Sequence, residues 1–276
     1  MWDWRTEYIP SNKKAIRFDL GDTLLFSIFI IGTAGSGKSF LTSAFANWLK
    51  LKKQEVLSIN LDPGVLNLPY IPDVDIREYV SLEEGMKKYK LGPNGAQIMA
   101  MDLLATKIEE IRSDIEEFNA DYALIDTPGQ MELFAFRASG PYIIRELVVD
   151  PKAILYLFDA TLSSHPSNYI SNLFLANAVY TRFTLPTLFV LSKIDLLPKR
   201  EVAKILKWSR RSDILNDTLD EVSSDTRRLM NRGLIQLFSD LDLSFSLMPI
   251  SSTKEIGFIN LHAALLRIFS GGEEVT

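Results

Sequence analysis

The stretch GTAGSGKS at residues 32–39 decides the fold class of this 276-residue chain. It consists of a glycine, four residues and then Gly-Lys-Ser, and it lies between an apolar run and a helix-like stretch. In this pattern the glycines let the backbone curl so that its N–H groups face phosphate oxygens, while the helix N-terminus adds partial positive charge. The stretch predicts a phosphate-binding loop whose nucleotide contacts are Gly35, Ser36, Gly37, Lys38, Ser39 and Phe40.

Two side chains of this loop have specific expected roles. Lys38 is expected to reach the β and γ phosphates of a nucleoside triphosphate, and Ser39 to place its hydroxyl on Mg²⁺. The alternative is a glycine-rich turn with an incidental lysine. The strand pattern before the loop and the helix pattern after it favour the phosphate-binding interpretation.

Apolar runs and amphipathic stretches alternate along the chain. The runs that predict strands lie at residues 25–31, 55–60, 122–126, 153–158, 187–191 and 246–250, and the stretches that predict helices lie at 39–52, 96–118, 131–147, 169–183 and 258–269. Nearly continuous apolar strands are typical of a sheet buried on both faces. The alternation therefore predicts a doubly wound, mostly parallel sheet in a three-layer α/β/α fold of the P-loop NTPase type.

The domain organisation expected from this pattern is simple. Residues 1–23 lack clear periodicity and are predicted to be an N-terminal extension, followed by one domain at 24–276. Two segments, at about 63–119 and 199–242, are longer than a short crossover needs, and such insertions are usually functional or interface-forming. The second is helical and charged, which favours a solvated face, with partner docking as the alternative.

Composition excludes several kinds of site. The chain has no cysteine and only two histidines, which excludes disulfides and thiolate metal sites and disfavours a histidine-built metal site. Its net charge of -5 argues against broad nucleic-acid binding, so no direct nucleic-acid partner is expected. The early apolar run is far shorter than the roughly 20 residues that span a bilayer. We therefore expect a cytoplasmic protein without membrane insertion.

DTPGQ, at residues 126–130, directly follows a predicted strand. Asp126 ends that strand, where a carboxylate can hold Mg²⁺ through its water shell. Gly129 can offer its N–H to a γ-phosphate because no side chain blocks the approach. Gln130 is the candidate for orienting the attacking water. The alternative is a tight turn whose glutamine faces solvent.

NLDPG, at residues 60–64, follows the second predicted strand, which should neighbour the phosphate-binding loop. Asp62 is placed to contact the Mg²⁺ water shell or the nucleophilic water. An Asp-Pro-Gly turn that merely leaves the strand stays open as the alternative.

The base-binding end is predicted from LFVLSKID, at residues 188–195. The carboxylate of Asp195 can accept hydrogen bonds from N1–H and from the exocyclic amine of guanine, a donor pair that adenine lacks, so it would specify GTP. Lys193 would lie along the base and ribose with its methylene stem. Ser192 stands where the usual guanine-reading tetrapeptide has Asn or Thr, and so keeps a hydroxyl but loses reach.

A last, weaker motif is PISSTKEIG, at residues 249–257. It follows a predicted strand, and Ser251 and Ser252 suit a loop whose backbone contacts the guanine O6. A helix N-cap before Ile256 fits these residues nearly as well.

Taken in order, GTAGSGKS, LDPG, GPN, DTPGQ and SKID resemble the GPN-loop GTPases, a family of dimeric P-loop GTPases related to signal-recognition-particle GTPases and MinD-like ATPases. The resemblance extends from about Phe26 to Phe269. It implies a Mg²⁺-dependent enzyme that hydrolyses GTP to GDP and phosphate as a homodimer and changes conformation with the nucleotide. It also implies that Glu132 acts with Asp62 and Gln130 on the water, although Glu132 equally suits the first turn of a helix.

The triplet that names this family lies in LGPNGAQ, at residues 91–97. Pro93 fixes its own φ, and Gly92 and Gly95 permit tight bends, which predicts a stiff, hairpin-like tip that holds Asn94. The resemblance implies that this loop reaches the partner's nucleotide site, where Asn94 acts in place of an arginine finger.

Two other functions stay open at this point. One is an assembly factor or scaffold in which nucleotide stabilises a dimer and turnover is incidental. The other is a MinD-like ATPase or a small-molecule kinase. The sequence does not identify the client protein.

Overall fold

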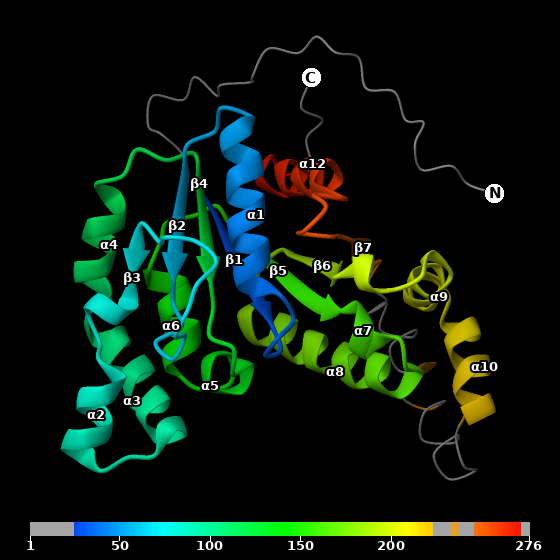
Figure 1. The fold of residues 1–276 in the computed structure, drawn as a ribbon, viewed down its shortest axis with the longest axis horizontal. Helices are drawn as coiled ribbons and strands as arrows, with labels where there is room; N and C mark the ends of the chain where they lie inside the picture. Colours follow the sequence, from blue (N-terminus) through cyan, green and yellow to red (C-terminus); the bar gives the residue numbers. More distant parts are fainter. Residues whose placement is uncertain (1–24, 223–232, 234, 237–245, 272–276) are drawn as a thin grey trace.

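The computed structural model describes residues 25–222, 233, 235–236 and 246–271. Its centre is a seven-stranded parallel sheet in the order β3-β2-β4-β1-β5-β6-β7 (Figure 1). The strands are β1 (Phe26–Gly32), β2 (Val56–Asn60), β3 (Val74–Asp75), β4 (Tyr122–Asp126), β5 (Lys152–Asp159), β6 (Thr187–Ser192) and β7 (Met248–Pro249). The predicted doubly wound parallel sheet is confirmed, and the short edge strand β3 was not predicted.

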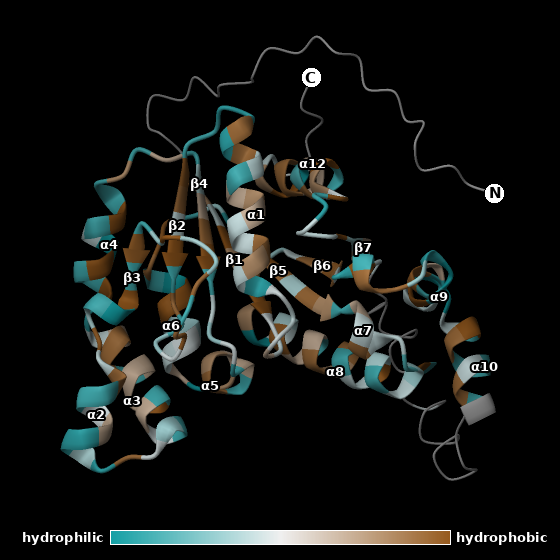
Figure 2. Ribbon diagram, viewed as in Figure 1, coloured by the Kyte–Doolittle hydropathy of each residue, from teal (hydrophilic) through white to brown (hydrophobic). Residues whose placement is uncertain are grey.

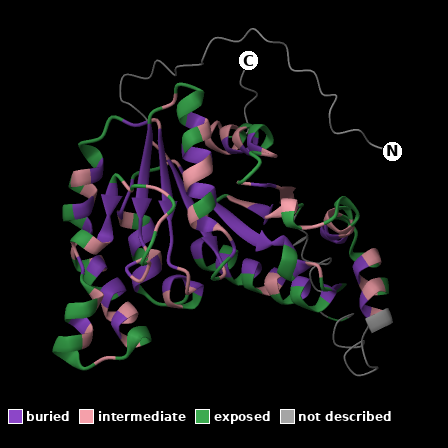
Figure 3. Ribbon diagram, viewed as in Figure 1, coloured by how far each residue is buried: buried purple, intermediate pink, exposed green. Residues whose placement is uncertain are grey.

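The sheet is covered on both faces, as its apolar strands require (Figure 2). Along β1, Ile28 and Ile30 pack in the core beneath α1 (Lys38–Leu51) and α12 (Phe258–Phe269). Phe29 and Ile31 alternate with them and join the larger core on the opposite face. Strands β2, β4 and β5 are buried throughout, and β1 is buried after Phe26 (Figure 3), so the three-layer arrangement follows from side chains that alternate between two cores.

The described parts of both predicted insertions form helices on the face of the sheet that is covered by the larger core. The helices with buried side chains in the larger core are η1 (Ile76–Glu78), α3 (Pro93–Thr106), α4 (Ile108–Glu116), α5 (Met131–Ala135), α6 (Ser139–Glu146), α7 (Ala160–Ser163), α8 (Pro166–Phe183), α9 (Lys199–Arg210) and α10 (Ser212–Val222). Two more, α2 (Leu82–Tyr89) and η2 (Ile194–Leu196), place partly buried side chains against it. None of the described helices is both long and apolar enough to cross a membrane.

Two predicted helices are each divided. The stretch 96–118 forms α3 and α4, which separate at Lys107, and the stretch 131–147 forms α5 and α6. Gly140 permits the packing at the second division, because a Cβ atom there would collide with the carbonyl group of Phe134. The start of α6 can pack this closely on α5 only because residue 140 is glycine.

LGPNGAQ does not form the predicted glycine-bent tip. Gly92 is the N-cap of α3 with an ordinary φ of -72°, and Pro93 takes the first helical position, where its missing N–H costs nothing. The left-handed residue is Lys90, which ends α2 with a φ of 53°. Helices α2 and α3 pack together as an αα-hairpin, so the triplet is stiff because it begins a helix.

Parts of the predicted organisation lie outside the described residues. These are the extension at 1–23 and the later part of the insertion at 199–242, of which α9 and α10 are described.

Candidate functional site

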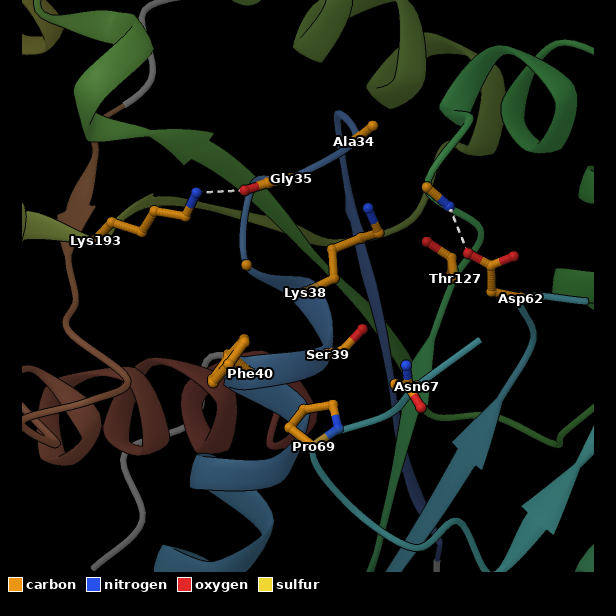
Figure 4. Close-up of a pocket in the computed structure, with 12 residues that line it drawn as sticks. Ala34, Gly35, Lys38, Ser39, Phe40, Asp62, Asn67, Pro69, Thr127 and Lys193 are labelled. Atoms are coloured by element: carbon orange, nitrogen blue, oxygen red, sulfur yellow. Dashed lines mark hydrogen bonds between the residues drawn. The ribbon is translucent and has the colours of Figure 1, made fainter. Parts of the chain in front are cut away.

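Five strand ends meet along one edge of the sheet. Strands β1, β2, β4, β5 and β6 end on Gly32, Asn60, Asp126, Asp159 and Ser192. Because all strands are parallel, these residues share an edge, and the register pairs Asn60 with Asp126 and Asp159 with Ser192. A cleft of about 390 Å³ opens there (Figure 4), lined by Ala34, Gly35, Gly37, Lys38, Ser39, Phe40, Asp62, Asn67, Pro69, Thr127, Gly129 and Lys193.

The loop at residues 32–39 has the curled backbone that its glycines predict. Gly35 and Gly37 have φ values of 76° and 95°, which side chains disfavour. The Nζ atom of Lys38 donates to the carbonyl oxygens of Gly32 at 3.0 Å and Thr33 at 3.2 Å. Burial lowers the pKa of Lys38, while the negative charges of Asp126 and Asp62 act in the opposite direction. The ammonium therefore lies inside the curl of the loop.

Ser192 ties the loop at residues 192–195, the predicted base-binding loop, to the loop at residues 32–39. Its single hydroxyl proton is shared between the carbonyl of Ser36 at 2.7 Å and that of Phe158 at 3.1 Å, and the residue is buried. The short side chain is thus bonded to backbone, and its predicted contact with the nucleotide stays a prediction. Phe40, in contrast, is 60% exposed beside the cleft.

Asp126 is a buried carboxylate with one oxygen left without a partner. Its Oδ2 accepts a hydrogen bond from the Tyr70 hydroxyl at 3.2 Å. Its Oδ1 is buried and has no hydrogen-bonding partner among the described residues. Burial raises the pKa of Asp126 to about 6, although Ser39, Lys38 and Tyr70 oppose the rise. An unpaired, desolvated carboxylate oxygen is a group that a cation can satisfy.

Tyr70 was not predicted as a site residue. It belongs to LPYIPD, the proline-flanked run after the NLDPG motif, and only folding brings it to Asp126. Burial and the nearby Asp126 carboxylate raise its pKa, so the phenol stays a hydrogen-bond donor at neutral pH. The nearest signal in the sequence is a stiff aromatic segment directly after a phosphate motif.

Asp62 links the loop after β2 to the loop after β4. Its Oδ1 accepts from the Gly64 N–H at 2.8 Å, and its Oδ2 accepts from the Gly129 N–H at 3.0 Å (Figure 4). The Gly129 N–H, predicted to face a γ-phosphate, therefore donates its hydrogen bond to Asp62 here. The side chain of Asn60 holds the backbone of Asp62. Its Oδ1 accepts from the Asp62 N–H at 3.0 Å, and its Nδ2 donates to the Asp62 carbonyl at 3.2 Å.

Asn60 is itself fixed from the neighbouring strand. Its amide donates to Asp75 Oδ1 at 2.9 Å, and Asp75 accepts from the Arg77 guanidinium. Arg77 also donates to the carbonyl of Val65 at 3.0 Å, which returns the network to the Asp62 loop. Sequence reasoning missed this support because its members come from separate strand ends.

Gln130 and Asn94 come together, although 36 positions separate them in the chain. The Gln130 amide donates to Asn94 Oδ1 at 3.3 Å within the same chain. Gly92, Pro93 and Asn94 are exposed at the start of α3. Glu132 is exposed in the first turn of α5, where the helix dipole favours an acid, and it does not line the cleft.

The predicted base-binding loop is fixed at both ends. Lys193 has a φ of 58°, and its Nζ donates to Asp159 Oδ2 at 2.7 Å and to the Gly35 carbonyl (Figure 4). Asp195 Oδ2 accepts from the Thr253 hydroxyl at 3.0 Å. Although burial acts to raise the pKa of Asp195, hydrogen bonds from Ser251 and Thr253 hold it below its usual range. Asp195 is therefore charged at neutral pH.

Residues 251–256 form a closed loop against Asp195. The backbone groups of Ser251 and Ile256 bond to each other at 3.1 Å in both directions. The N-cap of α12 is Gly257, so the alternative of a helix N-cap before Ile256 is wrong. Ser251 is buried and Ser252 is half-buried, and their predicted contacts with guanine stay predictions.

Comparisons with known proteins place this architecture in one family. A protein-family model described as "Conserved hypothetical ATP binding protein" matches residues 30–270. GPN-loop GTPase PAB0955 of Pyrococcus abyssi is 33% identical over 236 residues, which cover 85% of this chain and 93% of that protein. Its crystal structure, described as a GTPase in apo form, matches with a TM-score of 0.78 and 30% identity, covering 88% of this chain and 97% of that chain.

Eukaryotic relatives are similar over different shares of their length. GPN-loop GTPase 3 of Mycosarcoma maydis is 31% identical over 252 residues, which cover 86% of this chain and 89% of that protein. GPN-loop GTPase 1 of Dictyostelium discoideum is 35% identical over 197 residues, or 70% of this chain, and the chain spans about half of it, 49%. The motif order, the parallel sheet and these matches agree, and the chain belongs to the GPN-loop GTPase family.

Proposed function

We propose that this chain binds GTP with Mg²⁺ and hydrolyses it to GDP and phosphate. The observation that carries the proposal is the meeting of three parts at one edge of the sheet. These are the curled loop around Lys38, the buried Asp126 with its unpaired oxygen, and the base-binding loop that Lys193 bonds to the phosphate-binding loop. Phosphoryl transfer depends mainly on positioning and charge stabilisation, which these parts can provide.

The residues present suit Mg²⁺ as the cofactor. Magnesium prefers oxygen ligands and usually combines one or two protein ligands with water and phosphate oxygens. Among the residues the structure describes, no group of three or more acidic, histidine or cysteine side chains could form an all-protein metal cage. Ser39 and Asp126 would hold the ion, whose bound form neutralises charge on the β and γ phosphates. Support comes from the unpaired Oδ1 of Asp126.

Asp62 is suited to respond to the γ-phosphate. A phosphate oxygen that accepts the Gly129 N–H would compete with the Asp62 carboxylate, which accepts it at 3.0 Å. Asp62 Oδ2 would then be free to accept from the attacking water, which Gln130 orients. Binding of GTP thereby exchanges a contact between two loops, which gives hydrolysis a structural consequence.

Removal of the Gln130 amide tests the enzymatic function. Gln130→Ala is expected to lower kcat for GTP by about 10- to 100-fold because the attacking water loses its orientation. Phosphate release at saturating GTP measures the change. Gln54→Ala, outside the cleft in the loop that precedes β2, is the matched control and should keep wild-type kcat. Equal, barely detectable turnover in wild type and Gln130→Ala would instead support the assembly-factor function.

We further propose a homodimer in which the Gly92–Asn94 loop serves the partner's nucleotide. The exposure of Asn94 at the start of α3 supports this proposal, because the side chain is accessible to a second copy. In the isolated chain the side chain of Asn94 accepts a hydrogen bond from Gln130, so the two amides are compatible hydrogen-bonding partners. The client protein and the cytoplasmic location stay predictions.

Mixed dimers distinguish action in trans from action in cis. Subunits carrying Asn94→Ala and subunits carrying Lys38→Ala are each expected to be nearly inactive alone. If the loop acts in trans, one site of the mixed dimer has both defects and the other is intact. Activity should therefore recover to about half of wild type per mixed dimer, once native mass measurement confirms subunit exchange. Mixed dimers that stay inactive would indicate action within one chain.

A further inference from the structure

Asp159 is a buried carboxylate whose two oxygens face different elements. It is the last residue of β5 and 4% exposed. Its Oδ1 accepts from the Thr161 N–H at 2.8 Å, the Thr161 hydroxyl at 2.6 Å and the Leu162 N–H at 3.3 Å, and so caps α7. Its Oδ2 accepts from Lys193 Nζ at 2.7 Å. Capping alone requires only one oxygen, which leaves the second to be explained.

Lys193 connects Asp159 to the phosphate-binding loop. Its ammonium also donates to the Gly35 carbonyl, and its methylene stem passes over Gly37, with Cε 3.5 Å from the place of a Cβ atom there. The lysine backbone is left-handed, with a φ of 58°. A long, flexible side chain is thus fixed at its far end by one carboxylate and one carbonyl.

The negative charge of Asp159 holds the Lys193 ammonium in place. Although burial acts to raise the pKa of Asp159, the hydrogen bonds from Lys193 and Thr161 hold it below its usual range, so it is an anion at neutral pH. Beside the Gly35 carbonyl that accepts from Lys193, the N-terminus of α1 and the Lys38 ammonium belong to the same loop and repel a second cation. Without an anion beside it, the Lys193 ammonium would be drawn to solvent or to the phosphates.

Asp159 also supports the other wall of the base-binding loop. Through its Oδ1 it fixes the start of α7, and α7 packs against η2, the turn that contains Asp195. One side chain therefore contacts both the lysine and the helix that bracket the predicted guanine site.

We propose that Asp159 is a positioning residue for the guanine base. It holds Lys193 stretched across the phosphate-binding loop, so that the methylene stem forms a fixed surface under the base, and tight binding of guanine nucleotides depends on this hold. The inference rests on the proposed function, because it requires that residues 192–195 bind guanine.

The test compares GDP binding in variants that separate the two oxygens. Asp159→Asn removes the charge that faces Lys193 and keeps an oxygen that can cap α7. Asp159→Ser keeps a good capping residue and is too short to reach the Lys193 ammonium, so it covers the case in which the Asn variant fails to fold.

Both variants are expected to bind GDP about 10-fold or more weakly than wild type, as for a lost hydrogen bond between charged groups. The KM for GTP should rise equally, with kcat within about twofold. Asp217→Asn, the same change at an exposed carboxylate of α10 outside the cleft, is the matched control and should bind GDP like wild type.

A double-mutant cycle separates positioning from a merely structural role. With Lys193→Met, which keeps the apolar stem, the Asp159→Asn substitution should weaken GDP binding no further. Wild-type affinity in Asp159→Asn or in Asp159→Ser would overturn the inference, as would a full additional loss on top of Lys193→Met. Failure of the wild-type protein to bind GDP would overturn the proposed function as well, so the two failures are distinguishable.

Discussion

Replacing Asp126 with Asn is expected to abolish Mg²⁺-dependent GTP hydrolysis and, at the same time, to stabilise the nucleotide-free protein. The first effect follows because an amide cannot provide the negative charge that Asp126 would offer to Mg²⁺. We expect kcat to fall at least about 100-fold. The second effect follows because the folded protein buries a carboxylate that has one oxygen unpaired.

The sign of the stability effect follows from the pKa. Burial raises the pKa of Asp126 to about 6 from an ordinary value of 3.8. A raised pKa means that the folded state prefers the protonated acid, so the free energy of unfolding falls as pH rises through the interval from about 4 to about 6. Above that interval the full penalty applies. At about pH 7 Asp126→Asn should therefore be more stable than wild type by about 1–3 kcal/mol.

Chemical unfolding at several pH values measures this difference. The stability advantage of Asp126→Asn should be present at about pH 7 and shrink as pH falls through about 6 towards 4, because wild type then takes up its proton. Asp217→Asn, an exposed change in α10, should show no such advantage at any pH. A variant that is destabilised at about pH 7, or that keeps Mg²⁺-dependent turnover, would contradict the assignment of Asp126.

Replacing Asp195 with Asn is expected to change the base that the site accepts. A carboxylate offers two acceptors to the N1–H and the amine of guanine, whereas an amide offers one acceptor and one donor. Xanthine keeps N1–H and carries a carbonyl in place of the amine, so it matches Asn. Affinity for GTP should fall about 100-fold or more and affinity for xanthosine triphosphate should rise, because mismatched polar groups lose their partners.

Competition among GTP, ATP and xanthosine triphosphate for one labelled nucleotide measures this exchange. Asp213→Asn, at an exposed carboxylate outside the cleft, is the matched control and should leave the preference unchanged. ATP binding that is tight in wild type and indifferent to Asp195→Asn would instead support an ATPase or a small-molecule kinase. The experiment therefore also decides whether this chain prefers GTP, as the names of its relatives suggest, or ATP, as the description of the family model suggests.

Local patterns in the sequence predict the framework closely. The expected strand at 122–126 is β4, and the expected helix at 258–269 is α12, with the same ends. The curl of GTAGSGKS is equally local, because glycine at positions 35 and 37 permits the positive φ values found there. These features depend on neighbours a few positions apart, and so their physics can be judged from short stretches.

Packing between distant parts of the chain decides the features of the fold that local patterns do not predict. The short strand β3 exists because it pairs with β2, and the division between α5 and α6 depends on a close approach at Gly140. The Gly-Pro-Asn triplet in LGPNGAQ shows the same effect inside a motif. Its residues suit a turn, but they begin α3, which packs against α2.

The sequence by itself determined the parallel sheet, the phosphate-binding loop and the order of motifs that identifies the family, because each is encoded in side-chain periodicity or backbone freedom over a few residues. Only the tertiary structure decided which side chains hold the site in place. Tyr70 meets Asp126 across 56 positions, Thr253 meets Asp195 across 58, and Lys193 meets Asp159 across 34. Such contacts arise where parallel strands end at one edge, and that edge exists only after the sheet has formed.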